Sequence, residues 1–384
     1  MKEIIYLDYN ATTPVDDIVL EKMLPWFTTS FGNASSSNHA YGWQAASAID
    51  LAREQVAELI NATKEEIIFT SGATESINLA IKGLFEWYRG EKKHIITCAT
   101  EHKAVVDTCS YLDKKGAEIS LLPVNHNGEI DLVQLKQLIR KDTLMVVLMY
   151  VNNETGVIHP IDTIGEICRA NQVLFFCDAT QAVGKIPVDV ETSKIDLLCF
   201  SAHKFYGPKG VGMLYHKRKK PRVNLTAILH GGGHERGFRS GTLNVPGIVG
   251  IGAASSLASN FLVQEPKRIM LLRNQLETNL LKNNQAYING KNSNRISHVS
   301  NICFQNVIPG RLLTGISSRL AVASGSACTS ASPQPSHVLK AMGLSDVDAK
   351  NSIRFSLGRY TTAADIEMAN AVIYDEISKL ENII

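Results

Sequence analysis

The chain carries a lysine that is placed to form a Schiff base. Lys204 ends the tetrapeptide Ser201-Ala202-His203-Lys204, which follows an apolar segment ending at Phe200 and precedes a glycine-proline turn. A lysine at the end of a buried strand, among hydroxyl and imidazole groups, can anchor an aldehyde cofactor. The alternative is a surface lysine at a strand end, which is common. The other polar residues that follow apolar segments decide between these two interpretations.

A second group has the character of a phosphate site. The segment Ser71-Gly72-Ala73-Thr74-Glu75-Ser76 follows the apolar residues 66–70 and opens a helical pattern. Small residues such as Ala73 let backbone N–H groups approach an anion, Thr74 adds a hydroxyl, and the helix dipole favours negative charge. The alternative is an ordinary helix N-cap with a capping acid.

Two further groups could contact a planar ring. His102 follows the apolar residues 94–98 and could stack on an aromatic cofactor and move protons, or could be an ordinary loop histidine. Asn153 follows residues 144–151, where an amide could hydrogen-bond a ring substituent or could simply belong to a turn.

Asp178 closes the apolar run 173–177, and Gln181 follows three residues later. A carboxylate at the end of so apolar a strand needs a partner, because burying a lone charge is costly. A pyridinium nitrogen is such a partner, whereas the alternative is a helix N-cap. Each group has an ordinary explanation by itself. Because an anion cradle, a stacking ring, an amide, a carboxylate and a lysine occur together, they predict a site for pyridoxal 5'-phosphate (PLP).

The segments that would position these residues alternate between strands and helices. Strand-like apolar runs cover 66–70, 94–98, 144–151, 173–177, 195–200 and 211–215, and helical spacing covers 43–60, 74–87, 103–115, 131–139 and 161–170. Strands this apolar indicate a mostly parallel sheet covered by helices on both faces. In such sheets ligands gather at the carboxyl ends of the strands, where all five groups lie.

A change of pattern after residue 260 predicts a second domain. A long charged helix from 264, short strands at 299–304 and 352–357 and a final helix from 363 replace the earlier alternation. We therefore expect a large cofactor-binding domain over residues 16–260 and a smaller α+β domain formed by residues 1–15 and 261–384. A chain of 384 residues is long enough for two domains.

The composition excludes several classes of protein. With 45% hydrophobic residues, 20% charged residues and a formal charge of +2, the chain has the composition of a globular protein. It is not that of a dedicated nucleic-acid or membrane binder. The longest apolar run, 144–151, is far shorter than a membrane helix. Seven cysteines without paired zinc spacing, and an N-terminus without a signal sequence, predict free thiols in a cytoplasmic protein.

Motifs along nearly the whole chain resemble those of the cysteine desulfurases, the PLP-dependent fold-type-I enzymes that take sulfur from L-cysteine. The likeness is strongest to the housekeeping iron–sulfur cluster assembly type. The implied fold is α/β, with a mainly parallel seven-stranded sheet covered by helices and a smaller α+β domain. The matching segments are 7–14, 31–33, 69–76, 100–105, 151–154, 178–181, 201–210, 230–237, 239–242, 323–330 and 352–359.

The resemblance implies roles around the cofactor ring. Lys204 would hold PLP as a Schiff base and act in catalysis, Asp178 would pair with the pyridinium nitrogen, and His102 would stack on the ring. Gln181 would bond the phenolic oxygen, and Asn153 would lie close to both cofactor and substrate.

The resemblance also implies how the two anionic groups are held. The phosphate would contact residues of one subunit and Thr242 of its neighbour in a homodimer. Arg354 and Asn33 would bind the substrate carboxylate, a task that suits the planar guanidinium group. The phosphate ligands from the same subunit would be Ala73, Thr74, Ser201 and His203.

Cys328 narrows the reaction. It lies in a run of small residues, and we expect a mobile loop of the small domain at about 323–334. A mobile thiolate suits a nucleophile that must visit the cofactor and then a second partner. The resemblance implies that Cys328 takes the sulfur of L-cysteine as a persulfide and that L-alanine is released. The remaining cysteines, which we expect to be buried, are Cys98, Cys109, Cys168, Cys177, Cys199 and Cys303.

Alternatives to this function stay open in the sequence. The chain could be a related PLP lyase acting on selenocysteine or cysteine sulfinate, or a docking protein with little activity alone. The implied sulfur acceptors are an iron–sulfur scaffold or a tRNA-thiolation carrier, without direct binding of nucleic acid. No metal site is predicted, and whether Cys328 transiently binds a nascent cluster is open. The chain ends at Ile384, before the tail with which family members dock the scaffold, so that contact is open too.

One basic segment has two interpretations. The run 216–222 contains five lysine and arginine residues and could contact an acidic carrier protein. A solvated basic loop is the simpler expectation.

Overall fold

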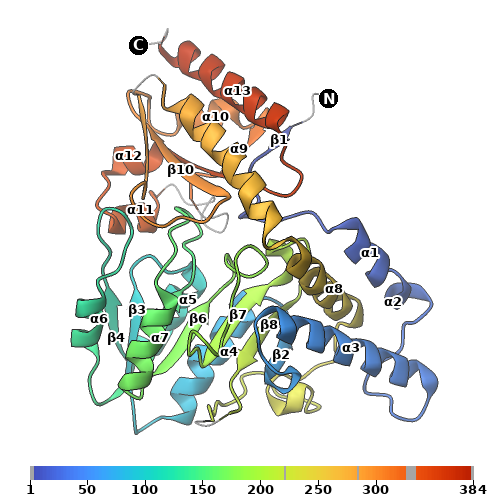
Figure 1. The fold of residues 1–384 in the computed structure, drawn as a ribbon. Helices are drawn as coiled ribbons and strands as arrows, with labels where there is room; N and C mark the ends of the chain where they lie inside the picture. The colour runs from blue at the N-terminus through green and yellow to red at the C-terminus, as the bar shows by residue number, and fades with distance from the viewer. Residues whose placement is uncertain (1–3, 220–221, 283–284, 326–333, 382–384) are drawn as a thin grey trace.

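The computed structural model describes residues 4–219, 222–282, 285–325 and 334–381. Its centre is a seven-stranded sheet in which β8 runs antiparallel to both of its neighbours, while the other adjacent pairs are parallel. The prediction of a mainly parallel seven-stranded sheet is confirmed. In spatial order (Figure 1) the strands are β2 (Ile67–Thr70), β8 (Gly212–His216), β7 (Leu197–Ser201), β6 (Leu174–Asp178), β5 (Thr143–Met149), β3 (His94–Cys98) and β4 (Glu118–Leu122).

Helices cover both faces of this sheet because successive side chains of its strands point in opposite directions. In β5, Val146 and Leu148 join one apolar cluster, whereas Met145 and Val147 join the other. Two helices pack on the second cluster, namely α4 (Ala73–Trp87) and α5 (Lys103–Asp113). The first cluster is covered by α1 (Asp17–Met23), α3 (Ala40–Leu59), α6 (Leu132–Leu138), α7 (Ile161–Ala170) and α8 (Val245–Phe261).

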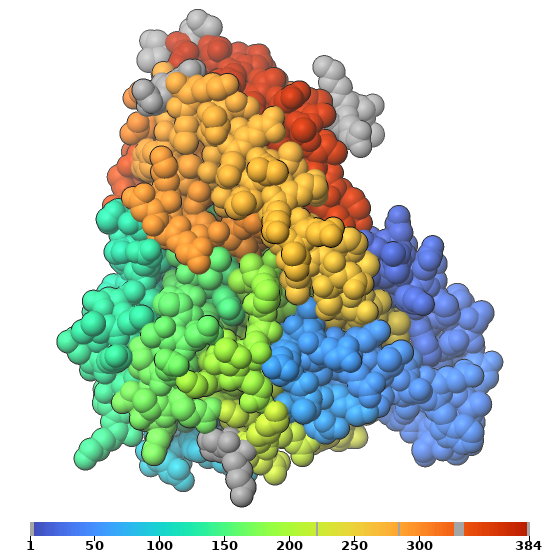
Figure 2. All heavy atoms as spheres, in the orientation of Figure 1, coloured from blue at the N-terminus to red at the C-terminus, as the bar shows by residue number. Residues whose placement is uncertain are grey.

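A separate core is built by the C-terminal part of the chain together with the N-terminal segment. Figure 2 shows it as an orange and red lobe resting on the green and yellow part of the molecule. Ile5 and Leu7 belong to this core, and β1 (Ile5–Tyr6) pairs in parallel with β11 (Leu320–Ala321). Its antiparallel sheet has the order β12 (Ser352–Ser356), β10 (Val299–Phe304) and β9 (Ala286–Ile288).

Helices of unequal length surround this smaller sheet. The long helices α9 (Gln264–Leu280) and α13 (Ala363–Glu381) bury apolar side chains against it, as does the short α10 (Arg311–Ile316). The domain boundaries at residues 16 and 260 remain a prediction. The remaining short helices are α2 (Pro25–Thr28), α11 (His337–Ala341) and α12 (Asp346–Lys350).

Several elements were absent from the predicted pattern, and for two of them the physical reason is clear. The strand β4 lies at the sheet edge, where Leu121 is exposed and Glu118 to Ser120 are half-buried, so it lacks a continuous apolar signature. The helix α8 is rich in glycine and small apolar residues on all sides, which removes the helical periodicity.

The basic run 216–222 differs from the expected solvated loop. His216 and Lys217 are buried, and Lys217 Nζ lies 3.3 Å from Asp196 Oδ1. Lys219 is exposed and pairs with Glu191 at 2.6 Å. The expectation is therefore wrong for the first two residues, because His216 ends β8 and Lys217, which follows it, is also buried. Residues 220–221 lie outside the described ranges.

The cysteine side chains and the apolar helices bear on two expectations from the sequence, namely buried thiols and the lack of a membrane helix. The six cysteines within them are buried, as expected. No described helix alone is long and apolar enough to cross a membrane, although α8 and α9, bent by 74° to each other, reach that length and composition as a pair.

Candidate active site

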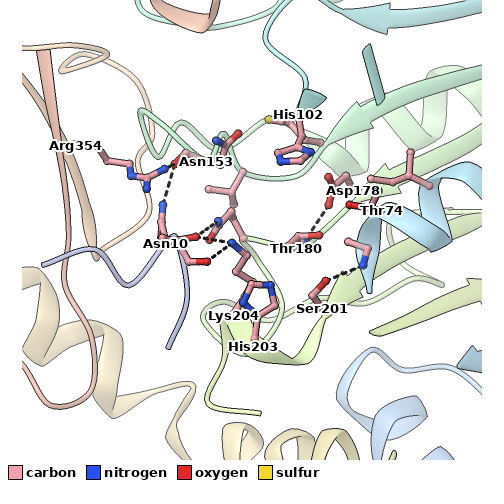
Figure 3. A pocket seen from close by; sticks show the side chains of 16 residues that line it. Asn10, Thr74, His102, Asn153, Asp178, Thr180, Ser201, His203, Lys204 and Arg354 are labelled. Carbon is pink, nitrogen blue, oxygen red and sulfur yellow. Dashed lines mark hydrogen bonds between the residues drawn. The ribbon is translucent and has the colours of Figure 1, made fainter. Parts of the chain in front are cut away.

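A cavity of about 160 Å³ opens at the carboxyl ends of β5, β6 and β7. The N-terminal segment and β12 close it from the other side, as Figure 3 shows for Asn10 and Arg354. We call this cavity the active-site pocket. The predicted site residues that line it are Ala73, Thr74, His102, Asn153, Asp178, Gln181, Ser201, His203, Lys204 and Arg354.

Lys204 lies on a short 3-10 turn, η2 (Ala202–Lys204), which directly follows β7. Its Nζ donates to the carbonyl oxygens of Asn10 at 2.7 Å and Ala11 at 2.8 Å. The turn is held by Gly207, whose N–H bonds to the Ala202 carbonyl at 3.0 Å. The fold thus presents the lysine amine to the pocket on a fixed backbone.

Asp178 is the last residue of β6 and is buried. Its Oδ1 accepts a hydrogen bond from the backbone N–H of Thr180 at 3.0 Å. The thiol of Cys199 on the neighbouring strand lies 3.8 Å from the same oxygen. The carboxylate is therefore held by a backbone donor, and it faces a pocket in which a cationic ring nitrogen would be its partner.

His102 caps the N-terminus of α5, and its geometry fixes a tautomer. The backbone N–H of Ala104 donates to His102 Nδ1 at 3.1 Å, so Nδ1 is an acceptor and the neutral ring carries its proton on Nε2. The preceding Glu101 is buried, and its Oε1 accepts from the Met149 N–H at 2.7 Å. Burial raises the pKa of Glu101 well above its ordinary value, which favours its neutral form.

The opposite end of the pocket is suited to an anion. The helix α4 begins at Ala73, whose N–H donates to Ser201 Oγ at 2.7 Å. A side chain at Gly212 would place its Cβ 2.6 Å from Gly72 Cα, so β8 and the start of α4 pack backbone against backbone. Small residues here expose the helix N-terminus, and its dipole favours a phosphate group.

His203 lies beside this end of the pocket, and its Nδ1 contacts Thr12 Oγ1 at 3.1 Å. Burial, followed by the positive charges of Lys204 and Lys209, lowers the pKa of His203 to about 4. The imidazole is thus neutral at pH 7 and offers a single N–H donor.

Arg354 approaches the pocket from β12 and is almost completely buried. Its Nη1 donates to the Asn153 carbonyl at 2.9 Å, and its Nη2 donates to Asp8 Oδ1 at 2.7 Å. A guanidinium group has five N–H donors, so donors remain for a ligand carboxylate. The two contacts fix the plane of the group, which favours bidentate binding.

Asn10 is a buried residue that joins several of these groups, although sequence reasoning did not select it. Its side chain donates to the Asn153 carbonyl at 3.0 Å and contacts His298 Nε2 at 2.9 Å. Its own carbonyl accepts from Gln181 Nε2 at 3.1 Å as well as from Lys204. No strand pattern precedes Asn10 in the sequence. Its position in the matching segment 7–14 was therefore the one sequence feature that could have identified it as a site residue.

The polar atoms that lack partners show whether the pocket fits PLP. Three buried atoms of its lining residues have no hydrogen-bond partner among the described residues, namely Asn153 Oδ1, Thr180 Oγ1 and Arg354 Nε. Buried polar atoms are normally hydrogen-bonded, and leaving one unpaired costs about 1–3 kcal/mol. A ligand with an anionic end, a polar ring and a carboxylate would pair these atoms, so the pocket fits PLP and an amino acid. Thr180 was not singled out from the sequence, although it lies in the segment 178–181.

Two of the predicted residues do not line the pocket, and a third is not described by the structure. Asn33 is exposed, and its Oδ1 accepts from the Ser35 N–H at 2.9 Å. Thr242 is exposed in the loop after η3 (Glu235–Gly237). Cys328 lies outside the described residues, as does most of the predicted loop 323–334. The described residues also contain no cluster of side chains that could hold a metal ion.

Comparison of the amino-acid sequence with known proteins also indicates a PLP-dependent cysteine desulfurase. A family model for aminotransferase class-V matches residues 5–368. The chain is 52% identical over 382 residues to the cysteine desulfurase IscS of Shewanella sp. strain MR-4, covering 99% of this chain and 94% of that protein. It is 51% identical over 381 residues to the cysteine desulfurase IscS of Anaeromyxobacter sp. strain Fw109-5, with the same coverage.

Solved structures agree with these relatives. A NifS-like protein superimposes with a TM-score of 0.92 at 38% identity, covering 98% of this chain and 100% of that chain. SspA, solved in complex with cysteine, superimposes with a TM-score of 0.82 at 38% identity, covering 93% and 99%. The chain therefore belongs to the aminotransferase class-V family and, within it, is a PLP-dependent cysteine desulfurase.

Proposed function

We propose that this chain removes the sulfur of L-cysteine, retains it as a persulfide on Cys328 and passes it to acceptor proteins. One observation supports the proposal most strongly. The active-site pocket sets Lys204 and Asp178 around a space that is also lined by Asn153, Thr180 and Arg354, each of which has a buried polar atom without a partner among the described residues.

Bound PLP would supply an electrophilic aldehyde and an electron-withdrawing ring, which weaken the bonds at the α-carbon of an amino acid. Lys204 would hold the aldehyde and, once released, carry a proton to or from the substrate. Asp178 would keep the ring nitrogen protonated, because a buried carboxylate is stabilised by a cationic partner. His102 would lie against the ring, oriented by the bond that its Nδ1 accepts from the Ala104 N–H.

Arg354 and Asn153 would orient the substrate. The guanidinium plane is fixed by Asp8 and by the Asn153 carbonyl, so its unpaired Nε is available to a carboxylate. The unpaired Asn153 Oδ1 could accept a hydrogen bond from the same ligand. Both groups are buried, which strengthens the interaction relative to one in water.

The sulfur-transfer step is a nucleophilic substitution at sulfur. The Cys328 thiolate would attack the Sγ of the substrate, the S–Cβ bond would break, and its electron pair would remain with the carbon skeleton. After protonation of that carbon the products are L-alanine and the Cys328 persulfide, so atoms and electrons balance without an external oxidant. A reductant or an acceptor protein then removes the persulfide sulfur.

Covalent trapping of the cofactor tests the lysine assignment. Reduction of the holoenzyme with borohydride should fix PLP to the peptide that contains Lys204, and Lys204→Ala should abolish both the trapped peptide and the visible absorbance. A reduced adduct on Lys185 or Lys209 in the wild-type chain would contradict the assignment.

We also propose that the functional unit is a homodimer. The segment from α1 to α3 exposes large apolar side chains that a monomer would leave in water, among them Phe27, Phe31 and Trp43, each more than half exposed. Thr242 is likewise exposed, as expected for a residue that acts on the neighbouring subunit.

Mixing two inactive variants tests the shared site. A dimer of one Lys204→Ala subunit and one Thr242→Val subunit has one site that retains both residues if Thr242 acts on the neighbouring subunit. We expect the isolated mixed dimer to regain about half of the PLP absorbance per site, because one of its two sites is intact, and a random equal mixture to regain about a quarter. If the mixture shows no more PLP absorbance than its two components, or if light scattering shows a monomer, the proposal of a shared site is contradicted.

Iron–sulfur cluster assembly is the proposed destination of the sulfur. The support is 52% identity over almost the whole chain to cysteine desulfurases named IscS. Radiolabelled sulfur from L-cysteine should appear on an iron–sulfur scaffold protein mixed with the enzyme. Label that stays on this chain in the presence of the scaffold would argue for a different acceptor, such as a carrier for tRNA thiolation.

A further inference from the structure

Lys185 is a half-buried lysine beside the active-site pocket. It lies in the turn that follows β6, and its Nζ donates to Gln181 Oε1 at 2.7 Å. Burial, followed by the charges of Lys204 and Arg354, lowers the pKa of Lys185 well below its ordinary value. The nearby carboxylate of Glu265, which acts in the opposite direction, forms its salt bridge with Arg359 at 2.8 Å. A lysine in so unfavourable a place is a candidate for a functional role.

The contact with Lys185 determines which way the Gln181 amide points. The Lys185 amine donates to the amide oxygen, and the Asn10 carbonyl on the other side can only accept, so the amide oxygen faces Lys185. The amide nitrogen then faces away from it and donates to the Asn10 carbonyl at 3.1 Å. Turning the amide over would break both hydrogen bonds. Gln181 is buried and lines the pocket, so this choice decides whether a ligand meets a donor or an acceptor.

The same network reaches Lys204. The Asn10 carbonyl that accepts from Gln181 also accepts from Lys204 Nζ at 2.7 Å. A chain of hydrogen bonds therefore runs from Lys185 through Gln181 and Asn10 to Lys204. Both lysines also line a small second cavity of about 30 Å³. The titratable and charged groups whose charges couple with Lys185 are Lys204, Arg354, His203, His298 and Glu265.

We propose that Lys185 is a positioning residue that holds the Gln181 amide with its N–H donors toward Asn10 and the active-site pocket. The inference rests on the proposed binding of PLP in that pocket, where Gln181 would donate to the phenolic oxygen of the ring. Without Lys185 the amide can turn its oxygen toward the phenolic oxygen, which replaces an attraction by a repulsion. Lys185 itself touches neither the cofactor nor the substrate.

The test compares the holoenzyme with two variants at position 185. Lys185→Met keeps the length and the apolar stem but has no donor, whereas Lys185→Arg keeps donors. We expect Lys185→Met to raise the dissociation constant for PLP about fivefold to tenfold. We also expect it to move the absorbance titration of the bound cofactor to higher pH, by up to about one unit, because a phenolic oxygen that loses a donor is more basic. Lys185→Arg should lie closer to the wild type than Lys185→Met.

Two controls separate positioning from a general loss of charge or stability. Lys136→Met removes the same charge from an exposed site on α6 and should leave both readouts unchanged. Lys185→Met should unfold at the same urea concentration as the wild type or a higher one, because it removes a half-buried amine that makes no salt bridge with the described residues.

A double-mutant cycle identifies the route through which Lys185 acts. If it acts through Gln181, adding Lys185→Met to Gln181→Leu changes the PLP dissociation constant little beyond the effect of Gln181→Leu alone. If the losses of PLP affinity in the two single variants simply add in the double variant, the inference is overturned. A Lys185→Met variant that binds and titrates PLP like the wild type, or equal losses in the methionine and arginine variants, would overturn it as well. A wild-type chain that binds no PLP would instead overturn the proposed function, and this inference with it.

Discussion

The buried ion pair between Arg53 and Glu235 gives a prediction whose size follows from its contacts. Glu235 belongs to the loop that leads to Thr242, and both Glu235 and Arg236 have left-handed backbone angles, with φ of 50° and 57°. Such angles are unfavourable for residues other than glycine, so surrounding contacts must hold the loop. Arg53 Nη1 and Nη2 donate to the two Glu235 carboxylate oxygens at 2.7 and 2.6 Å, and the Phe69 N–H donates at 2.8 Å.

Arg53→Met removes two of these three donors and leaves the Glu235 carboxylate buried without its partner. The Glu235 side chain is only 1% exposed, so water cannot replace the guanidinium group. Breaking a buried pair by removing one partner costs about 3–5 kcal/mol, which agrees with about 1.5–3 kcal/mol for each of two charged hydrogen bonds. We expect the free energy of unfolding to fall by this amount.

Equilibrium unfolding in urea, followed by both fluorescence and circular dichroism, measures the change. The midpoint should fall by about 1 M or more. Replacing the charge as well, in Arg53→Met/Glu235→Gln, should recover at least half of the loss, because no unpaired charge remains buried. The exposed pair of Arg89 and Glu86, 3.6 Å apart, provides the control, and Arg89→Met should change stability by no more than about 0.5 kcal/mol.

Two results would refute this reasoning. One is an Arg53→Met midpoint equal to that of Arg89→Met, which would mean that the pair contributes no more than a surface contact. The other is a double variant less stable than Arg53→Met, which would mean that the cost does not arise from an unpaired buried carboxylate.

Three further predictions concern packing, pH and substrate binding. Gly212→Ala would place Cβ 2.6 Å from Gly72 Cα, so urea unfolding should show a loss of about 2 kcal/mol or more and PLP should bind more weakly. Gly343→Ala, where nothing lies within 4 Å but φ is 91°, should cost only the backbone strain of about 1–2 kcal/mol, and a loss as large as that of Gly212→Ala would contradict the steric argument. Burial lowers the pKa of His159 to about 4, so on acidification the unfolded chain binds a proton at this residue before the folded chain does. The contribution of His159 to the free energy of unfolding is therefore complete above about pH 6.5 and is lost as the pH falls toward 4. Between pH 7 and pH 5 the wild type should lose about 2 kcal/mol more than His159→Leu in urea unfolding, and parallel losses would show that His159 is not responsible. Arg354→Lys should raise the KM for L-cysteine about tenfold to hundredfold in steady-state kinetics, because an ammonium group cannot bind Asp8, the Asn153 carbonyl and a carboxylate in one plane. An unchanged KM would remove Arg354 from the substrate site.

The residues at strand ends could be predicted because their signal is local. Asp178 and Ser201 close strands whose apolar runs are visible in the sequence, and Lys204 follows Ser201 directly. Once a parallel sheet is inferred, the rule that ligands gather at its carboxyl edge brings these residues together. The structure places them around one pocket for the same reason.

The contacts that cross between segments could not be predicted. Asn10 reaches the pocket because the N-terminal segment pairs with the C-terminal core at β1 and then passes across the sheet edge. The amide orientation of Gln181 depends on Lys185, and the loop before Thr242 depends on Arg53, which is 182 residues distant in sequence from its partner Glu235. None of these pairs has a periodicity or spacing that a single sequence reveals.

Alanine production from L-cysteine is the most direct test of the central claim, that Cys328 receives the sulfur in a PLP site built on Lys204. The measurement compares the wild type, Cys328→Ser and, as a control, Cys303→Ser, all in the presence of dithiothreitol. Cys303 is buried, so its substitution should leave the reaction intact. We predict that Cys328→Ser keeps the cofactor absorbance and still binds cysteine but forms no alanine. Alanine formed by Cys328→Ser at the wild-type rate would contradict the account.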